Sequence, residues 1–256
     1  MERQRARRFG VKAGACAVTG MAACLVFANR ASADASTSIS PAAVESAPLS
    51  AIELPATRDS PGVAIFPARG PGAHPITVLL HGMCGDAARA CGHFANEVTR
   101  TSNLICPRAN QRCAAGGASW PEQGVAAFVE SAVTRAKATL GEGVDDSHGR
   151  TLIGYSLGAY RATAIAQGSA RKYPRVMLIG AKISLDRALL SESGVERVLL
   201  CAGDWDMMHD PMQRESARLQ RAGVQARFLS LGPVGHSFTP SFASYLPGAL
   251  AWLVGS

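Results

Sequence analysis

The sequence lacks the residue spacings from which zinc sites are usually built. Its seven cysteines include no C-x-x-C pair, and they lie near no pair of histidines spaced to complete a tetrahedral set of ligands. These absences argue against a structural zinc site. We expect the protein to need neither a metal ion nor another cofactor.

The sequence also has no basic stripe and no run in which basic and aromatic residues are interleaved. Its formal net charge is +7, but six basic residues and one acidic residue lie within residues 1–33, so the remainder carries only +2. A nucleic-acid-binding surface needs a concentrated positive patch. The composition therefore argues against a nucleic-acid partner.

The N-terminal apolar stretch, AGACAVTGMAACLVFA, is shorter than the roughly 20 residues of a transmembrane helix. It follows a basic segment and precedes the small residues ASA, an order that predicts a secretory signal peptide over residues 1–33, cleaved after Ala33. The pair Arg7 and Arg8 leaves a twin-arginine route open. Two alternatives remain, an uncleaved anchor and a lipoprotein lipidated at Cys24. We expect export to the periplasm or the extracellular space, without stable membrane insertion after cleavage.

Five cysteines follow the predicted signal peptide, and export would carry them into an oxidising compartment. Four of them allow three pairings. We favour the pairing of sequence neighbours, Cys84 with Cys91 and Cys106 with Cys113, which would close two loops. We expect Cys201, inside the apolar segment RVLLCAG, to be a buried free thiol.

The chain beyond the leader divides into two parts. Residues 34–60 are rich in Ala, Ser and Pro and have no sustained period, which predicts a flexible lead-in. Over residues 61–256, unbroken apolar runs such as PITVLLHG, RTLIGYS and RVMLIGA alternate with segments of helical spacing. Such runs are typical of strands buried on both faces, with helices as crossovers. The pattern predicts one α/β domain with a mostly parallel central sheet and helices on both faces.

The stretch GYSLG places Ser156 between Gly154 and Gly158, after an apolar run and before a helix-forming segment. A strained strand-to-helix turn flanked by glycines is the arrangement that exposes a nucleophilic serine. The alternative is a serine that caps an ordinary turn. We interpret Ser156 as a catalytic nucleophile.

A serine hydroxyl needs a base to take its proton and an acid to orient that base. In parallel sheets such groups follow the carboxyl ends of strands. His236 follows the last predicted strand and is the expected base, and Asp206, in GDWD, is the expected acid. Asp204 remains an alternative acid, and Asp210 is expected to cap a helix beginning at Pro211.

Acyl transfer also produces an oxyanion that backbone amides can bind. Leu157 follows the serine at the start of a helix, and Met83 lies in the turn after LLHG, so we expect their N–H groups to form the oxyanion hole. We expect His81 to brace this turn through hydrogen bonds of its ring.

The order Ser156, Asp206, His236, together with the GYSLG and LLHGMCGD stretches, resembles the α/β-hydrolase superfamily over residues 61–256. The small core is similar to the dienelactone hydrolase and carboxylesterase-like branches. It differs from dienelactone hydrolases in having serine where they usually have cysteine, and HGMCG differs from the common HGLG. The resemblance implies the α/β-hydrolase fold and ester hydrolysis through an acyl-enzyme.

Helical lids in this superfamily commonly follow the strand after the nucleophile helix. Here only about 14 residues, KISLDRALLSESGV, separate two predicted strands, so we expect one short helix, no lid domain and an open site. We expect Trp120, Trp205 and Met207 to line it. Such a site suits small-molecule or polymer-borne esters.

The sequence thus predicts an exported serine hydrolase acting on carboxylic esters. Two alternatives stay open. An amidase or peptidase could use the same three residues, and a binding protein could retain the fold without the chemistry. The sequence does not indicate an oligomeric state.

Overall fold

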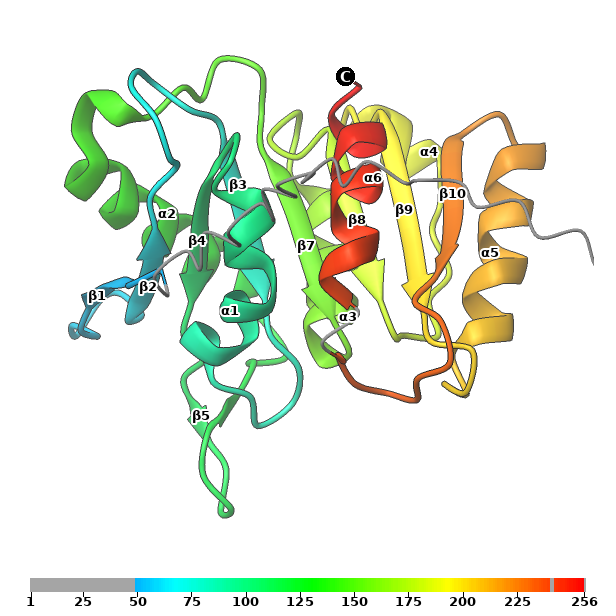
Figure 1. Ribbon diagram of the computed structural model, residues 1–256, viewed down its shortest axis with the longest axis horizontal. Coiled ribbons are helices and arrows are strands. Elements are labelled where there is room, and N and C mark those ends of the chain that lie inside the picture. The colour runs from blue at the N-terminus through cyan, green and yellow to red at the C-terminus, as the bar shows by residue number, and fades with distance from the viewer. Residues whose placement is uncertain (1–48, 240–241, 256) are drawn as a thin grey trace, which may run out of the picture. The chain divides into compact units, whose positions relative to one another are not determined.

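The computed structural model describes residues 49–239 and 242–255, which belong to one compact unit (Figure 1). The predicted signal peptide, the alternative lipidation site Cys24 and most of the predicted lead-in lie outside the described residues. Among the described helices, none combines the length and the apolar character needed to cross a bilayer.

An eight-stranded sheet forms the centre of the domain, in the order β1-β2-β4-β3-β7-β8-β9-β10. From β4 to β10 every neighbouring pair is parallel, whereas β1 and β2 are joined to the sheet by antiparallel pairing. The mostly parallel sheet is therefore confirmed. Its strands are β1 (Ile52–Leu54), β2 (Val63–Phe66), β3 (Ile76–Leu80), β4 (Asn103–Pro107), β7 (Thr151–Tyr155), β8 (Arg175–Ile179), β9 (Arg197–Ala202) and β10 (Gln225–Ser230).

Helices cover both faces of the sheet, as expected (Figure 1). One face packs against α1 and α6, where Phe94 and Phe242 meet edge to face at 5.0 Å. The other packs against α2, α3, α4 and α5. The helices are α1 (Ala87–Val98), α2 (Val125–Leu140), α3 (Leu157–Gly168), α4 (Arg187–Glu192), α5 (His209–Arg221) and α6 (Phe242–Val254), with a short 3₁₀ turn at Gly141–Gly143.

Strand β3 shows why the apolar runs are unbroken. Successive side chains of a strand point to opposite faces. Val78 and Leu80 join the core under α2 and α3, whereas Leu79 joins the core under α1 and α6. Because both faces are buried, polar residues would have to be desolvated on either side, and apolar residues occupy nearly every position.

Two short elements were not expected from the sequence. Ile52–Leu54, within the segment interpreted as a flexible lead-in, forms β1 and pairs antiparallel with β2. Gln111–Arg112 (β5) and Ala118–Ser119 (β6) form a small hairpin that projects beyond the carboxyl ends of the strands (Figure 1). Elements of two or three residues are too short to carry a periodic pattern of apolar residues.

The preferred disulfide pairing is wrong. The bridges are Cys84–Cys113 and Cys91–Cys106. Cys91 lies on the buried face of α1, which packs against β4, the strand that carries Cys106. The pairing thus follows the packing of a helix on its sheet rather than proximity in sequence. Cys201 is confirmed as a buried free thiol, and burial raises its pKa.

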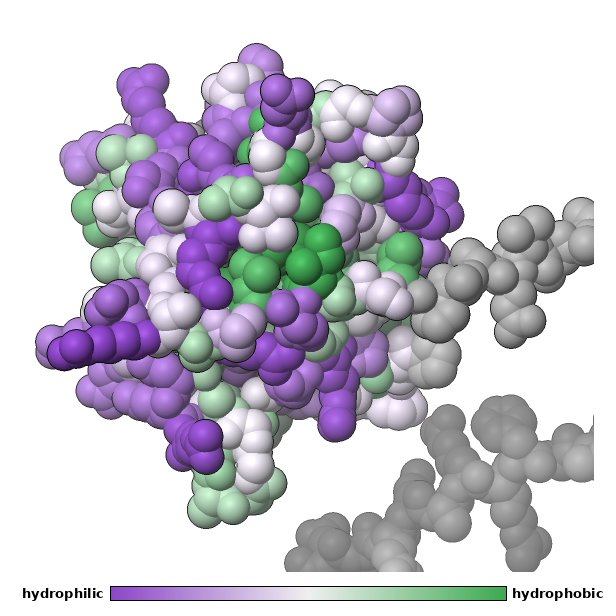
Figure 2. Space-filling model, turned by 90° about the vertical axis from the view of Figure 1, so that its left-hand side faces the viewer, coloured by the Kyte–Doolittle hydropathy of each residue, from purple (hydrophilic) through white to green (hydrophobic). Residues whose placement is uncertain are grey.

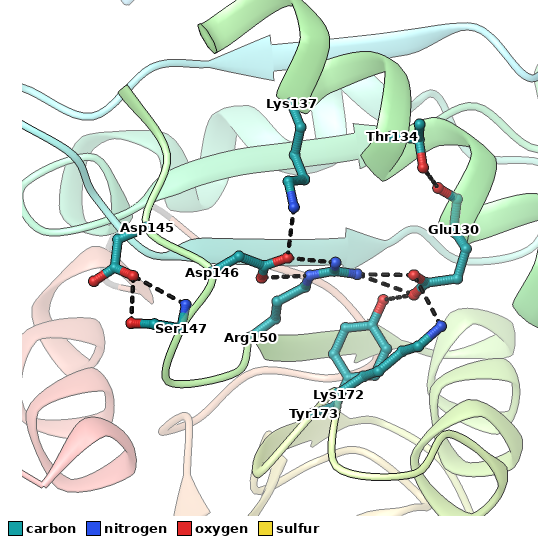
Figure 3. A network of polar contacts seen from close by, with 9 residues as sticks. All are labelled: Glu130, Thr134, Lys137, Asp145, Asp146, Ser147, Arg150, Lys172 and Tyr173. Atoms are coloured by element: carbon teal, nitrogen blue, oxygen red, sulfur yellow. Dashed lines mark hydrogen bonds and ion pairs between the residues drawn. The ribbon is translucent and has the colours of Figure 1, made fainter. Parts of the chain in front are cut away.

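A network of ion pairs holds α2 to the segment before β7 (Figure 3). Nearly buried Arg150 reaches Asp146 at 2.6 Å and Glu130 at 2.9 Å, and the Tyr173 hydroxyl donates to Glu130 at 2.7 Å. Burial alone would raise the pKa of Glu130 and Asp146, but hydrogen bonds from these partners outweigh it and hold both pKa values below the ordinary range. The ionised forms of both side chains therefore stabilise the folded state.

The face of the molecule at the β1 edge of the sheet is mainly hydrophilic, with a compact hydrophobic area near its centre (Figure 2). Edge strands leave backbone groups unpaired, and short, polar edges limit pairing with other chains. Strand β1 has only three residues, of which Ile52 and Glu53 are exposed.

Candidate active site

Ser156 lies on a tight turn between β7 and α3. Its φ of 53° and ψ of −120° are unfavourable for a residue with a side chain. A Cβ atom at Gly154 would lie 2.6 Å from Cα of Ala159, and one at Gly158 would overlap the carbonyl oxygen of Leu80. The two glycines therefore allow α3 to start directly against β3 and β7, which leaves the serine hydroxyl at the carboxyl edge of the sheet.

His236 lies between Ser156 and Asp206. Its Nε2 atom is 2.9 Å from Oγ of Ser156, and its Nδ1 atom is 2.8 Å from Oδ2 of Asp206. A carboxylate only accepts hydrogen bonds, so Nδ1 carries the proton and Nε2 accepts from the serine hydroxyl. The structure thus brings the three predicted residues into one hydrogen-bonded chain.

The environments of the three side chains differ. The side chain of Asp206 is only 4% exposed, whereas that of His236 is 43% exposed. The second carboxylate oxygen of Asp206 accepts the amide N–H of Met208 at 2.9 Å. The acid is buried and held on both oxygens, while the imidazole reaches solvent.

Backbone hydrogen bonds join the loops that carry Asp206 and His236. The amide of Asp204 donates to Gly232 at 2.8 Å, and that of Trp205 donates to Val234 at 3.1 Å. A Cβ atom at Gly203 would overlap the carbonyl oxygen of Val234. Because β9 and β10 are parallel neighbours, their following loops leave the same edge side by side.

The neighbouring acids have other partners. Asp204 contacts the Ser230 hydroxyl and lies 3.8 Å from Nε2 of His209. The expected helix start at Pro211 is wrong, because α5 begins at His209 and Asp210 lies in its first turn, 3.0 Å from Nδ1 of His209. The geometry therefore favours Asp206 over Asp204 as partner of the imidazole.

Two residues beside His236 were given no role in the site from the sequence. A Cβ atom at Gly180, whose φ is 62°, would lie 2.8 Å from Cε1 of His236 and 3.2 Å from Oδ2 of Asp206. The Tyr155 hydroxyl donates to the carbonyl oxygen of His236 at 2.9 Å, and the two rings stack at 5.3 Å. Burial and the charge of Asp206 raise the pKa of this tyrosine. The glycine that ends RVMLIG, on the strand next to GYSLG, was the available signal for the first.

The loop between β3 and α1, residues 81–86, lies against the serine. A Cβ atom at Gly82 would lie 3.3 Å from Cβ of Ser156, and Met83 follows directly. Leu157 is the first residue of α3, where backbone N–H groups have no partner within the helix. Both predicted oxyanion donors therefore belong to backbone segments next to the serine.

The bracing role expected for His81 is confirmed. Its buried ring accepts the N–H of Ala109 at Nε2, at 3.3 Å, so Nδ1 carries the proton and donates to the carbonyl oxygen of Gly82 at 2.8 Å. Burial lowers the pKa of this histidine, which favours the neutral ring that the two bonds require.

The expected lining residues divide into two kinds. Trp120 does not line the site, because it is 1% exposed and its indole N–H donates to the carbonyl oxygen of His81 at 2.7 Å. Trp205 and Met207 are 74% and 81% exposed and flank Asp206. Within the residues that the structure describes, no group of three or more His, Cys, Asp or Glu side chains could hold a metal ion.

No protein-family model and no curated protein sequence matches the chain. Solved structures, in contrast, are similar to it. FphF, a fluorophosphonate-binding serine hydrolase of Staphylococcus aureus, is 14% identical, with a TM-score of 0.61 over 82% of this chain and 100% of that one. A ferulic acid esterase is 16% identical, with a TM-score of 0.59 over 80% and 98%. A Bacillus cereus carboxylesterase is 17% identical, with a TM-score of 0.53 over 75% and 93%.

The chain has the α/β-hydrolase fold. At these identities the likeness establishes the fold alone, and the chemistry rests on the site itself. In this chain the segment between β8 and β9 holds a single six-residue helix, α4.

Proposed function

We propose that this protein is a serine hydrolase that cleaves carboxylic esters through an acyl-enzyme intermediate. The observation that carries the proposal is the hydrogen-bonded chain from Ser156 through His236 to buried Asp206. The likeness in fold to a fluorophosphonate-binding serine hydrolase and to two esterases supports it.

Each residue has a defined role in the proposed reaction. The Ser156 hydroxyl attacks the ester carbonyl carbon while Nε2 of His236 takes its proton, and Asp206 stabilises the resulting imidazolium. The amides of Met83 and Leu157 bind the oxyanion of the tetrahedral intermediate. His236 then protonates the leaving alcohol, and the same steps with water release the acid and restore the serine.

The proposed substrates are small-molecule or polymer-borne esters that reach an open site. The partly exposed His236 and the single short helix α4 support this accessibility. Trp205 and Met207 offer apolar surface beside the acid, suited to the apolar part of an ester.

Labelling with a fluorophosphonate probe and hydrolysis of p-nitrophenyl esters test the proposal. Ser156→Ala should abolish labelling and reduce kcat by at least about 10⁴-fold, because the nucleophile is lost. Ser191→Ala, at an exposed serine of α4, is the matched control and should behave as the wild type. A folded Ser156→Ala protein with undiminished ester hydrolysis would contradict the assignment of Ser156 as the nucleophile.

The choice of acid is tested in the same assay. Asp206→Asn should lower kcat by about 10³- to 10⁴-fold, because an amide no longer stabilises the imidazolium or selects its tautomer. Asp204→Asn should leave kcat within about threefold. The reverse order would transfer the role to Asp204, and faster cleavage of matched amides than of esters would favour an amidase.

We also propose that the chain is exported, with residues 1–33 as signal peptide and a hydrolase domain after the lead-in. The two disulfides support an oxidising compartment. Expression of the full chain in a bacterium, followed by cell fractionation and mass determination, should find a form beginning near Asp34 outside the cytoplasm. Full-length protein confined to the cytoplasm would contradict export.

A further inference from the structure

The small hairpin β5–β6 is fastened to the 81–86 loop. The Cys84–Cys113 disulfide joins them covalently. The amide of Ala118 donates to the carbonyl oxygen of Gly85 at 3.2 Å, and these two residues form an antiparallel bridge. The loop that carries Met83 is therefore paired with the hairpin on the side that follows Met83.

The fit between hairpin and loop is close. A Cβ atom at Gly117 would overlap the carbonyl oxygen of Cys84, so the two backbones touch where only glycine fits. Cys84 itself has a φ of 52°, a conformation that residues with side chains adopt only when their surroundings enforce it. The hairpin adds to the hydrogen bond from the Gly85 amide to the carbonyl oxygen of Gly82, at 3.1 Å, which closes the turn around Cys84.

The segment on either side of the hairpin fixes the other end of the loop. Ala109, before it, donates to the ring of His81, and Trp120, after it, donates to the backbone carbonyl of the same residue. Residues 109–120 thus hold the loop both before and after Met83. We call these residues the brace.

We propose that the brace, locked by the Cys84–Cys113 disulfide, is a positioning element that holds the Met83 amide where the oxyanion forms. This inference rests on the proposed function. An oxyanion donor accelerates the reaction only if it is already in place when charge develops, and loss of one donor costs about 10²- to 10³-fold in kcat. A loosened brace therefore lowers kcat, whereas KM changes little because the donor acts mainly in the transition state.

The second disulfide provides the matched control. Cys91–Cys106 joins α1 to β4, whereas Cys84–Cys113 joins the 81–86 loop to the hairpin. Removal of either bridge should lower the thermal midpoint, since each constrains the unfolded chain. Only removal of Cys84–Cys113 should affect the chemical step.

The experiment compares the double variants C84A/C113A and C91A/C106A with the wild type, using p-nitrophenyl acetate at a temperature where all three are folded. We expect kcat of C84A/C113A to fall by about 10- to 100-fold with KM within about threefold. The pH dependence should keep its shape, because His236 and Asp206 are unchanged. C91A/C106A should retain kcat within about twofold.

A second pair of variants tests the brace with the disulfides present. Gly116 and Gly117 both have positive φ, at 92° and 71°, but a Cβ atom at Gly116 meets nothing within 4 Å. Gly117→Ala should therefore lower kcat by at least about fivefold, and Gly116→Ala should not. If C84A/C113A fails to fold, this comparison tests by itself whether the brace positions the Met83 amide.

The outcomes separate the brace from the proposed function. Retention of kcat by folded C84A/C113A, or equal effects of Gly116→Ala and Gly117→Ala, would overturn the brace and leave the esterase proposal standing. Equal losses of kcat in the two disulfide variants would reduce the bridge to a stabilising role. A folded wild type that neither hydrolyses esters nor reacts with the probe would overturn both.

Discussion

At the scale of single residues, the proposed active site depends on backbone positions where a side chain would not fit. Gly154 and Gly158 let the turn that carries Ser156 approach β3, and Gly180 leaves room for the imidazole of His236. These glycines contribute no side-chain group to the proposed reaction. They fix the distances over which the hydroxyl, the imidazole and the carboxylate of Asp206 exchange hydrogen bonds.

Gly180→Ala tests this steric requirement. The added methyl group would lie 2.8 Å from Cε1 of His236, so the ring must shift from its bond to Ser156. We expect kcat for p-nitrophenyl acetate to fall at least about tenfold, because general-base catalysis depends on hydrogen-bond geometry. Gly223→Ala is the control, since this glycine also has a positive φ, 81°, but open space around it.

Both alanine variants should lose about 1 kcal/mol of stability from the left-handed conformation alone. Denaturant unfolding measures that loss, and kinetics measure the loss of activity. Equal kcat values for the two variants would show that the contact at Gly180 does not position His236.

The sequence indicated the three hydrogen-bonded residues of the candidate site better than the residues that pack around them. Ser156, His236 and Asp206 each directly follow or soon follow an apolar run, and parallel strands bring their carboxyl ends to one edge. Tyr155 and Gly180 gave no comparable signal, because their roles depend on side-chain packing across neighbouring strands. Trp120 was assigned to the site, but its indole is buried behind His81.

At the scale of elements, strands buried on both faces were predictable and short or covalently fixed elements were not. An unbroken apolar run such as RVLLCA is a strong signal because both of its faces lose contact with water. The hairpin β5–β6 has two-residue strands and owes its place to the Cys84–Cys113 bridge and to contacts with the 81–86 loop. Local sequence indicates neither which cysteines pair nor which loop the hairpin packs against.

The Arg150 network gives a prediction at this scale. Arg150→Ala leaves partly buried Glu130 and Asp146 without their main partner, so we expect the free energy of unfolding at pH 7 to fall by about 3 kcal/mol. Arg100→Ala is the control, because its pair with Glu97 is mostly exposed on the arginine side and should change stability by less than about 1 kcal/mol. Urea unfolding measures both.

The effect of pH on this difference follows from the direction of the pKa shifts. The pKa values of Glu130 and Asp146 are lowered in the folded state, so their contribution is present above the unfolded values near 4 and is lost as pH falls through the folded values. The gap between wild type and Arg150→Ala should therefore narrow below about pH 4. A gap that stays constant from pH 7 to pH 3 would contradict this account.

At the scale of the whole molecule, the loops after β3, β7, β9 and β10 converge at one edge of the sheet. Each carries part of the proposed site, and two of them also carry exposed apolar side chains. Met83 in the loop after β3, and Trp205 and Met207 in the loop after β9, are among the most exposed large hydrophobic residues described. The segment between β8 and β9 contains a single helix, α4, of six residues. Among the described residues, the apolar side chains around the proposed site are therefore exposed.

This accessibility predicts how the rate depends on the physical state of the substrate. An enzyme whose site must be uncovered by an interface accelerates when its substrate exceeds the solubility limit, whereas an open site needs no such opening step. With tributyrin, measured by titration of released acid, the rate should therefore follow a single hyperbola through the point at which the emulsion appears. A rise of several-fold at that point would contradict an open site and would indicate that a segment of the chain covers Ser156 in solution.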